Sequence, residues 1–310
     1  MRFNKLDLNL LVALDAMLQT RSITQAAKQL HMSQSAMSNA LARLRDHFED
    51  ELLVRVGRHL ELTQRAATLR EAVRDLLLRV ETTISAQPQF DPTQSERLFR
   101  IAASDYSAIV LIPHLLALAH RAGARVRFQL LPQVGDSALA LERGETDLLI
   151  IPKAYCSTEH PVEVLFEETF ACLVWAGSNQ AREGLDLAAY ARAGHVVMQP
   201  AGADRPAFGN GFLQSCGLER RVEVSTYSFL VEPALVVGTE RVATVHSRLA
   251  RWASGVLPVK QFAPPLDIPV MEQAIQWHKY RTSDPGLIWL LDLVRAAARE
   301  MDASATRGEN

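Results

Sequence analysis

The sequence predicts a winged helix-turn-helix domain at the N-terminus, a long helix after it, and an α/β unit that fills the remaining two thirds of the chain. The first observation behind this fold class is a set of three helical patterns and two short strands before residue 64. The second is a continuous helical period over residues 63–86. The third is an alternation of apolar strands with helical patterns from residue 97 onward, which is typical of α/β proteins.

The composition sets the limits of this interpretation. The chain has 310 residues, of which 48% are hydrophobic, and this is enough for two or three folded units. Its 33 basic and 35 acidic residues give a net charge of −2, so any signal for nucleic-acid binding has to be local.

Neither the cysteines nor the apolar segments indicate a metal, a cofactor or a membrane. Cys156, Cys172 and Cys216 have no metal-ligand spacing, so we expect reduced thiols. No apolar stretch approaches the roughly 20 residues that span a bilayer, and the N-terminus lacks the apolar core of a signal peptide. We therefore expect a cytoplasmic protein without a cofactor or a membrane partner.

Apolar periodicity predicts the first helix, and a capping pattern predicts the start of the second. One face of a helix begins after Asp7 and ends near Thr20. Its apolar positions are Leu10, Leu11, Leu14, Met17 and Leu18. Ser22 followed by Gln25 fits a capping box, so the second helix should start at Ile23.

The third helix should carry the residues that read DNA. Ser33 is a good N-cap for a helix that starts at Gln34, after a turn of three residues. Its buried stripe is Met37, Leu41, Leu44 and Phe48, and its other face is Gln34, Ser35, Ser38, Asn39, Ala42, Arg43 and Arg45. Short amide and hydroxyl side chains reach base edges in a major groove, and arginines bind phosphate or guanine. A solvated face of an ordinary bundle is the alternative, but the tight turn favours a helix-turn-helix.

Residues 52–63 predict a β-wing after the third helix. The segment indicates two short strands around Gly57, which would bring Arg55, Arg58 and His59 to backbone phosphates. The wing completes the predicted DNA-binding set. That set is Ser33, Gln34, Ser35, Ser38, Asn39, Arg43, Arg45, Arg55, Arg58 and His59.

The helical period of residues 63–86 predicts a long helix with one apolar stripe. The stripe is Leu69, Val73, Leu76, Val80 and Ile84. A stripe of this length suits a helix that pairs with its copy in a homodimer. A dimer would let two helix-turn-helix units read two half-sites. Packing of the stripe on its own domain is the alternative.

Beyond a hinge, the chain alternates strands and helices. The hinge is predicted over residues 88–96, which contain two prolines and no apolar period. Strands are expected at 98–103, 126–131, 148–152, 170–176, 196–199, 222–224 and 242–245, with helices at 108–119 and 137–142. This order predicts a parallel α/β architecture, whose ligands lie beyond the carboxyl ends of the strands.

Over nearly its whole length the chain resembles the LysR-type transcriptional regulators. The residues that carry the resemblance are Leu6–Leu18, Arg21–Phe48, the wing over 52–63, Glu240–Ala250 and Gln276–Leu290. The later segments resemble the branch that contains nodulation activators and regulators of aromatic and chlorophenol catabolism. Ser35 departs from the family pattern, which often has proline there. The departure removes a rigid helix start and leaves the donor pattern intact.

The resemblance implies a sensor of two Rossmann-like subdomains, similar to a type 2 periplasmic binding protein, with a small-molecule effector between them. The implied division is a winged helix-turn-helix over 1–63, a linker helix over 64–87, the hinge over 88–96, an effector-binding unit over 97–303 and a disordered tail over 304–310. Subdomain I would hold 97–165 and 268–303, and subdomain II would hold 166–267. The resemblance also implies a homodimer and homotetramer that bind an inverted repeat in double-stranded promoter DNA. Such a protein acts on RNA polymerase, and we expect an activator.

Strand ends and the resemblance supply the first candidate effector-binding residues. Ser104, Asp105 and Tyr106 occupy the first strand-to-helix turn, where a hydroxyl and free helix amides can bind an anion or a phenolate. Helix capping is the alternative for this turn. Glu168 and His278 match polar positions that the aromatic-responsive branch has available, and a structural role is the alternative for both.

Two later strand ends supply the remaining candidates. Met198 and Gln199 end one strand, while Thr226, Tyr227 and Phe229 follow another. These side chains offer ring contacts and a hydroxyl, with core packing as the alternative. We expect a small, mostly apolar aromatic effector with a phenolic or carboxylate oxygen.

An enzyme is the main alternative function, because an α/β fold with Ser, His and Asp can host hydrolysis. The sequence has no G-x-S-x-G elbow, no Walker A loop, no G-x-G-x-x-G and no H-E-x-x-H. A plain solute-binding protein would leave the first ninety residues unexplained. We therefore expect a DNA-binding regulator and not an enzyme.

Overall fold

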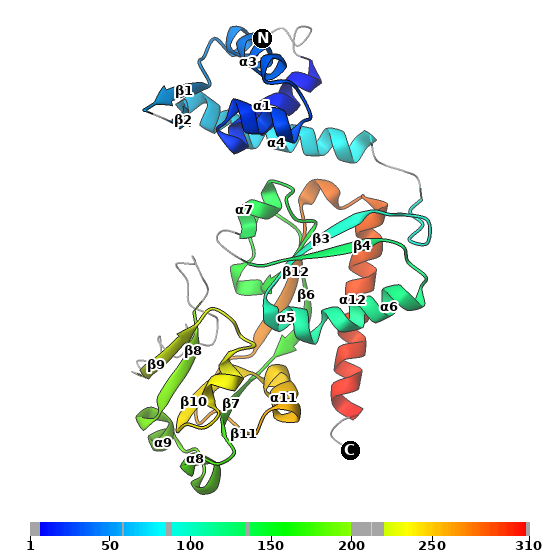
Figure 1. Ribbon diagram of the computed structural model, residues 1–310. Coiled ribbons are helices and arrows are strands. Elements are labelled where there is room, and N and C mark those ends of the chain that lie inside the picture. Colours follow the sequence, from blue (N-terminus) through cyan, green and yellow to red (C-terminus); the bar gives the residue numbers. More distant parts are fainter. Residues whose placement is uncertain are drawn as a thin grey trace. The chain divides into compact units, whose positions relative to one another are not determined.

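The structure is a computed structural model that describes residues 7–57, 59–84, 89–133, 137–199, 212 and 220–307 (Figure 1). The chain forms two compact units, Met1–Ala86 and Gln87–Asn310, which we call the N-terminal unit and the C-terminal unit. Each unit has hydrophobic clusters made of its own residues. Each unit therefore has its own core.

The N-terminal unit is a winged helix-turn-helix followed by a long helix. Its elements are α1 (Leu8–Thr20), α2 (Ile23–Gln29), α3 (Gln34–Phe48), β1 (Leu53–Val56), β2 (His59–Leu62) and α4 (Gln64–Ile84). The two caps predicted from the sequence are present, because Ser22 Oγ accepts from the Gln25 amide at 3.3 Å and Ser33 Oγ accepts from the Ala36 amide at 3.1 Å. Sequence patterns therefore placed the starts of α2 and α3 correctly.

The long helix α4 contributes part of its apolar stripe to the core of its own unit. Val73 is 5% exposed and belongs to the same hydrophobic cluster as Leu14 of α1, and Leu69 packs against that cluster. Arg74 of α4 also pairs with Asp15 of α1 at 2.6 Å. For this first half of the helix the alternative prediction, packing on its own domain, is the correct one. Leu76 and Val80 lie outside that cluster.

Subdomain I of the C-terminal unit is built on a five-stranded sheet in the order β4-β3-β5-β12-β6. Its strands are β3 (Leu98–Ala103), β4 (Arg127–Leu131), β5 (Leu148–Pro152), β6 (Val162–Glu168) and β12 (Met271–Gln276). β3 runs parallel to β4 and β5, whereas β12 is antiparallel to β5 and β6. The sheet is mixed because β12, a strand that the sequence analysis did not expect, returns from the other subdomain and runs antiparallel to β5. The prediction of a parallel arrangement was wrong for the strand expected at 170–176, which is antiparallel in the second sheet.

Helices complete subdomain I. They are α5 (Asp105–Val110), α6 (Ile112–Arg121), α7 (Ser137–Glu142) and α12 (Pro285–Arg307), with short 3₁₀ turns η2 (Lys153–Tyr155) and η4 (Lys279–Arg281). α6 and α12 lie side by side and share one hydrophobic cluster with the sheet (Figure 1). The sequence predicted one helix over 108–119, but Pro113 in the first turn of α6 starts a new helix after Leu111.

Subdomain II has a second five-stranded sheet in the order β11-β7-β10-β8-β9. Its elements are β7 (Phe170–Trp175), α8 (Asn179–Glu183), α9 (Leu187–Arg192), β8 (Gly194–Met198), β9 (Arg221–Thr226), η3 (Glu232–Val236), β10 (Arg241–His246), α11 (Ser247–Val256) and β11 (Val259–Phe262). β8 runs parallel to β9 and β10, and β7 is antiparallel to β10 and β11. The fold is therefore two Rossmann-like subdomains, as the sequence analysis expected.

The chain crosses between the subdomains twice. The first crossing lies at Thr169, between β6 and β7, and the second lies between β11 and β12. The predicted boundary at residue 165 falls inside β6, because this strand continues to Glu168. At the C-terminal end, α12 continues to Arg307, so residues 304–307 of the expected tail are helical and residues 308–310 lie outside the described part of the chain.

Candidate DNA-reading face and effector site

The outer face of α3 has the exposure that a reading helix needs. Met37, Leu41 and Leu44 are buried in the core, while the polar residues on the other side are exposed. The exposed residues are Gln34, Ser35, Ser38, Asn39 and Arg43. Ser33 caps the helix, and its hydroxyl lies 3.0 Å from that of Ser35. The face is therefore available for contact with base edges, and its use for DNA remains a prediction.

Arg45 has a structural arrangement that the sequence did not predict. Its Nε donates to the carbonyl of Glu51 at 2.8 Å, and its Nη2 donates to the carbonyl of Leu53 at 2.8 Å. The guanidinium also pairs with the Glu51 carboxylate at 3.1 Å. These contacts hold the start of the wing on α3, because Arg45 lies on α3 and its partners lie in β1 or just before it. We therefore remove Arg45 from the proposed DNA contacts.

The wing forms as predicted. β1 and β2 pair antiparallel with Val56 opposite His59, and Gly57 takes a φ of +63°, a backbone conformation that a residue with a Cβ rarely adopts. Arg55 and His59 are exposed, which keeps both available for phosphate contact. Arg58 lies outside the described residues.

The first strand-to-helix turn of subdomain I uses its own side chains as caps. Ser104 Oγ accepts from the Ser107 amide at 3.2 Å, and Asp105 Oδ1 accepts from the Tyr106 amide at 2.9 Å. The expectation that free amides of this turn bind an anion is therefore wrong for these two groups. The capping alternative holds for both Ser104 and Asp105, and the Ser104 side chain remains half-buried at the end of β3.

Asp105 also joins the two subdomains. Its carboxylate accepts from the Ser228 hydroxyl at 2.5 Å and from the backbone amides of Phe229 and Leu230 at 3.3 Å each. These three donors belong to the turn after β9 in subdomain II. Three donors from one turn hold the Asp105 carboxylate in place. Asp105 is thus an inter-subdomain contact as well as a cap.

A buried polar network lies next to this contact. Glu168, 1% exposed, accepts from the Tyr106 hydroxyl, and it pairs with Arg248 of α11 at 3.0 Å. Arg248 also pairs with Asp302 of α12 at 2.5 Å and donates to the carbonyl of Glu167 at 2.8 Å. Burial, and then the nearby charge of Glu168, raise the pKa of Tyr106 well above its usual value, so its phenol stays protonated and donates.

Aromatic rings surround the Tyr106 side chain. His246, at the end of β10, stacks on Tyr106 with ring centroids 4.0 Å apart, and Phe229 meets the His246 ring edge-on at 4.9 Å. Burial lowers the pKa of His246 to about 3, so this ring is neutral. The sequence analysis missed His246, although its position at a strand end was a usable signal.

The remaining candidates of subdomain II differ in exposure. Met198 is buried, whereas Tyr227 is 77% exposed. Gln199 is also exposed, and its backbone amide donates to the Thr226 carbonyl at 2.7 Å. Tyr227 therefore has too little burial to enclose a ligand. Glu232, which the sequence analysis missed, is buried at the start of η3. Burial first, and also the charge of Asp105, raise its pKa well above the usual value.

His278 lies at the wrong end of the sheet for the effector site. β12 is antiparallel to β5, with Gln273 opposite Pro152 and Gln276 opposite Leu149. The residues after Gln276 therefore lie at the amino end of β5, away from Ser104. There His278 packs on His160, with ring centroids 4.7 Å apart. Its structural alternative is thus the correct one.

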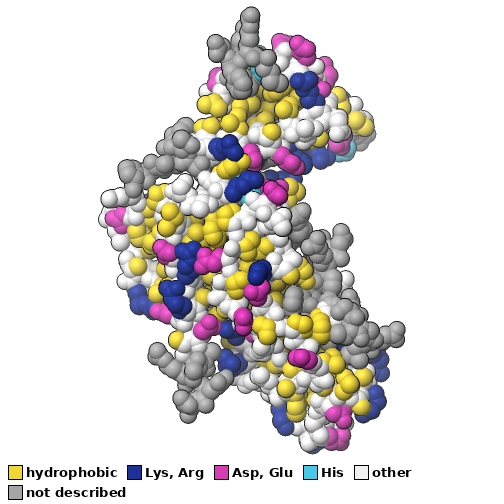
Figure 2. All heavy atoms as spheres, turned by 180° about the vertical axis from the view of Figure 1, so that it is seen from behind, with side chains coloured by type: hydrophobic (Ala, Val, Ile, Leu, Met, Phe, Trp, Pro, Cys, Tyr) yellow, Lys and Arg dark blue, Asp and Glu magenta, His cyan; other side chains and the backbone are white. Residues whose placement is uncertain are grey.

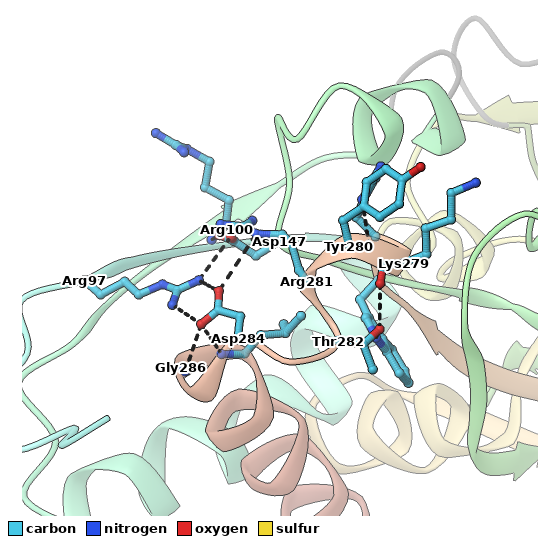
Figure 3. Close-up of polar contacts among 12 residues, drawn as sticks. Arg97, Arg100, Asp147, Lys279, Tyr280, Arg281, Thr282, Asp284 and Gly286 are labelled. Atoms are coloured by element: carbon cyan, nitrogen blue, oxygen red, sulfur yellow. Dashed lines mark hydrogen bonds and ion pairs between the residues drawn. The ribbon is translucent and has the colours of Figure 1, made fainter. Parts of the chain in front are cut away.

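The same amino end of the sheet carries a network of arginines and aspartates. Arg97 donates to both carboxylate oxygens of Asp284, at 2.7 and 2.6 Å, and Arg281 pairs with Asp147 (Figure 3). Asp147 also accepts from the Arg100 amide at 2.7 Å. The network ties the start of β3 to the start of α12, which is a structural role.

The surface of the C-terminal unit shows no basic face in the view of Figure 2, where Lys and Arg side chains alternate with Asp and Glu. Pairs such as Lys153–Glu272 at 2.8 Å and Arg121–Glu300 at 2.5 Å are part of this balance. Within the described ranges, no three His, Cys, Asp or Glu side chains are grouped to hold a metal ion. The described helices include none that is long and apolar enough to cross a membrane.

An exposed reading helix with a wing, joined to a two-subdomain α/β unit, defines the class of DNA-binding regulators with a ligand-binding-type domain. Two family models match this chain. The "Bacterial regulatory helix-turn-helix protein, lysR family" covers residues 8–67, and the "LysR substrate binding domain" covers residues 92–299. The chain therefore belongs to the LysR family of transcriptional regulators and is not an enzyme.

Similar proteins agree over nearly the full length. Nodulation protein D of Bradyrhizobium sp. (strain ANU 289) is 40% identical over 301 residues, which are 97% of this chain and 89% of that protein. Nodulation protein D 2 of Rhizobium leguminosarum bv. phaseoli is 39% identical over 308 residues, covering 99% of this chain and 97% of that protein.

Solved structures show the same fold. A probable transcriptional regulator of Pseudomonas aeruginosa, 28% identical, has a TM-score of 0.64 and covers 94% of this chain and 97% of its own. Full-length OxyR of Pseudomonas aeruginosa, 17% identical, has a TM-score of 0.71 and covers 95% of each chain. The OxyR likeness concerns the fold alone.

Proposed function

We propose that this regulator binds an inverted repeat in promoter DNA as a homodimer or homotetramer, and that a small uncharged aromatic effector held between subdomains I and II changes its action on RNA polymerase. The observation that carries the proposal is the meeting of residues from both subdomains. Asp105 and Tyr106 of subdomain I contact Ser228, Phe229 and His246 of subdomain II. A ligand at this place would touch both halves, which is what coupling to subdomain motion needs.

The local charges favour an uncharged effector. Three carboxylates lie in this region, those of Asp105, Glu168 and Asp302. The cations are Arg248, which pairs with two of them, and Arg220, whose charge acts on Glu232. Burial raises the pKa of Glu232 well above its usual value, which disfavours the charged form of this carboxyl group. A carboxylate ligand would meet like charges in a partly buried site, which is unfavourable. Of the two oxygens expected from the sequence, the phenolic one therefore fits better than the carboxylate.

The proposed mechanism is a shift between two arrangements of the subdomains. An effector can shift this equilibrium only by binding one arrangement more tightly than the other. The contacts of Asp105 with the turn after β9 exist only while the subdomains are close, so they distinguish the arrangements. A change of arrangement would alter the spacing of two reading helices in a dimer. We expect activation as the outcome, because the sequence resembles the branch of the family that contains nodulation activators.

DNA binding is tested with the intact protein and DNA selected from a random pool. We expect a recovered sequence with two half-sites related by inverted repetition, and binding that weakens steeply with added salt. Turnover of a small molecule without affinity for any DNA would contradict the proposal and support an enzyme.

The effector class is tested by thermal shift of the intact protein with phenol, 4-chlorophenol, 7-hydroxyflavone and salicylate, since a ligand that binds the folded state raises the unfolding temperature. We expect a shift for at least one uncharged phenol and none for salicylate. Phe229→Ala should weaken the shift, and Tyr227→Ala is the matched control because Tyr227 is 77% exposed. A shift with polar metabolites only would contradict the aromatic class.

A further inference from the structure

Gln273 is a buried glutamine that neither the fold nor the proposed contacts explain. It lies on β12, opposite Pro152 of β5 and Phe166 of β6, and is 2% exposed. The pairing of β12 with β6 shifts its register between Gln273 and Ala274. The extra residue is Leu165, so the irregularity lies on β6 and leaves the alternation of β12 intact. The Gln273 side chain contacts α5, where its Nε2 donates to Ser107 Oγ at 3.0 Å.

The hydroxyls of Ser107 and Ser104 continue this contact toward the effector site. Ser107 is fully buried, and its Oγ lies 3.1 Å from Ser104 Oγ. The Ser107 amide also donates to Ser104 Oγ at 3.2 Å. Gln273, Ser107 and Ser104 therefore form one hydrogen-bonded row, which we call the glutamine–serine row. It leads from the inside of the sheet to the half-buried end of β3.

The Gln273 amide fixes the direction of one hydrogen bond in the row, and the bond between the two hydroxyls has two possible directions. An amide nitrogen only donates, so Ser107 Oγ accepts from Gln273 and is left with its own hydrogen to give. Either hydroxyl of the Ser104–Ser107 pair can donate. Donation by Ser107 is favoured, because a hydroxyl that accepts a hydrogen bond becomes a better donor. Ser104 Oγ then accepts twice, from the hydroxyl and from the amide of Ser107, and its two lone pairs are filled. The hydrogen of the Ser104 hydroxyl is therefore left to donate outward.

We propose that Gln273 is a positioning residue that acts through Ser107 to fix the Ser104 hydroxyl as a hydrogen-bond donor, so that the effector must present an acceptor oxygen there. The proposal rests on the proposed function, because it concerns the same effector site. The Oε1 atom of Gln273 supports it, since this buried oxygen has no partner among the described residues. A buried acceptor without a donor is costly, and its retention indicates that the amide serves another purpose.

The test uses two ligands of nearly the same shape. Acetophenone has a carbonyl oxygen that only accepts, and α-methylstyrene carries a carbon in its place. Calorimetry on the full-length protein should show that acetophenone binds about 3- to 10-fold tighter, the range of one neutral hydrogen bond. Gln273→Met should bring this ratio close to one, and so should Ser107→Ala and Ser104→Ala.

A matched control separates positioning from general damage to the sheet. Gln276 lies on the same strand, is fully buried and donates to the carbonyl of Ser157 at 2.7 Å, away from Ser107. Gln276→Met should keep the ligand ratio of the parent. In a Ser104→Ala background, adding Gln273→Met should change the ratio no further, because both act through the same hydroxyl. Circular dichroism checks each variant for folding, and Ser107→Ala decides if Gln273→Met does not fold.

Different results would overturn different claims. Three results would overturn the role of Gln273. Gln273→Met could keep the parent's ratio of acetophenone to α-methylstyrene affinity, Gln276→Met could lose as much of this ratio as Gln273→Met, or the losses could add in the double variant. A parent that binds phenol but not acetophenone would also overturn it, while the proposed function stands. Thermal shifts with polar metabolites and with no aromatic compound would overturn the proposed effector class itself, and the role of Gln273 with it.

Discussion

The N-terminal unit exposes the polar residues proposed for its function, whereas the C-terminal unit buries them. On α3 the proposed DNA-reading side chains, such as Gln34 and Asn39, are exposed and stand apart from the core. In the C-terminal unit, Glu168 is 1% exposed and Tyr106 is also buried, and both are tied into one network. A substitution on the reading face should therefore act alone, whereas a substitution in the network should affect its neighbours as well.

The largest expected effect tests whether the two units fold independently. Val73→Asp places an unpaired charge in the core of the N-terminal unit, and we expect a loss of about 4 kcal/mol or more. All four tryptophans lie beyond residue 86, so tryptophan fluorescence reports the C-terminal unit alone. In Val73→Asp, the unfolding transition of the N-terminal unit should be absent from the circular dichroism signal. The unfolding transition of the C-terminal unit, followed by tryptophan fluorescence, should remain.

Val80→Asp is the matched control for that variant. Val80 lies outside the N-terminal core, and we expect this variant to remain folded and to lose dimerisation and DNA binding together. Sedimentation would measure the loss of the dimer. A simultaneous loss of both unfolding transitions in Val73→Asp would show that the units are not independent.

The second effect concerns the buried network. Glu168→Ala leaves Arg248 without its buried partner, and we expect a loss of about 3 to 5 kcal/mol in the C-terminal unit. Lys153→Ala is the control, since it removes an exposed pair that contributes about 1 kcal/mol or less. Urea unfolding followed by tryptophan fluorescence measures both. Equal small losses of unfolding free energy in both variants would mean that the buried network is no more coupled than an exposed ion pair.

The third effect concerns the reading face. Gln34→Ala or Asn39→Ala should weaken binding to the selected operator by about 1 to 3 kcal/mol while leaving binding to unrelated DNA unchanged. Arg43→Ala should weaken both and reduce the salt dependence. Fluorescence anisotropy at several salt concentrations distinguishes them. Equal losses on all sequences from all three variants would contradict the assignment of α3 as the reading helix.

The fourth effect is a dependence on pH that belongs to the C-terminal unit. The pKa of His246 is lowered by burial to about 3, below its unfolded value near 6.5. Its contribution to stability is therefore present above pH 6.5 and is lost as the pH falls toward 3, with a slope of about 1.4 kcal/mol per pH unit. Burial also lowers the pKa of His195 to about 4, so this residue contributes the same kind of stability loss over a narrower pH range. His246→Phe should flatten the fluorescence-detected loss between pH 6 and pH 4, and an unchanged slope would contradict this account.

Local patterns in the sequence were sufficient wherever local forces decide the structure. Ser22 and Ser33 cap helices through bonds to residues three positions away, so spacing alone located the starts of α2 and α3. The strand β3 was also predicted with its observed ends, because its apolar run stops at a capping serine.

Long-range contacts were not accessible in the same way. Arg45 was assigned to DNA because its spacing allows exposure, but the loop carbonyls of Glu51 and Leu53 bind it in the fold. His278 was proposed for the effector site from the family resemblance, and the antiparallel direction of β12, which puts it at the other end of the sheet, is not visible in the sequence. Gln273 was missed for the same reason, since its contact with Ser107 spans 166 positions in the chain.

The two crossings between the subdomains have a mechanical consequence. Both crossings lie next to β6 and β12, so a hinge motion of the subdomains takes place about the ends of these two neighbouring strands. Asp105 follows β3, which lies two to three strand spacings, or about 10 to 15 Å, from those crossings. With this lever arm, a bend of about 4 to 6° would lengthen the Asp105–Ser228 distance from 2.5 Å by about 1 Å, to the limit of a hydrogen bond. The Asp105–Ser228 hydrogen bond is therefore sensitive to a small rotation and breaks long before the subdomains have moved apart.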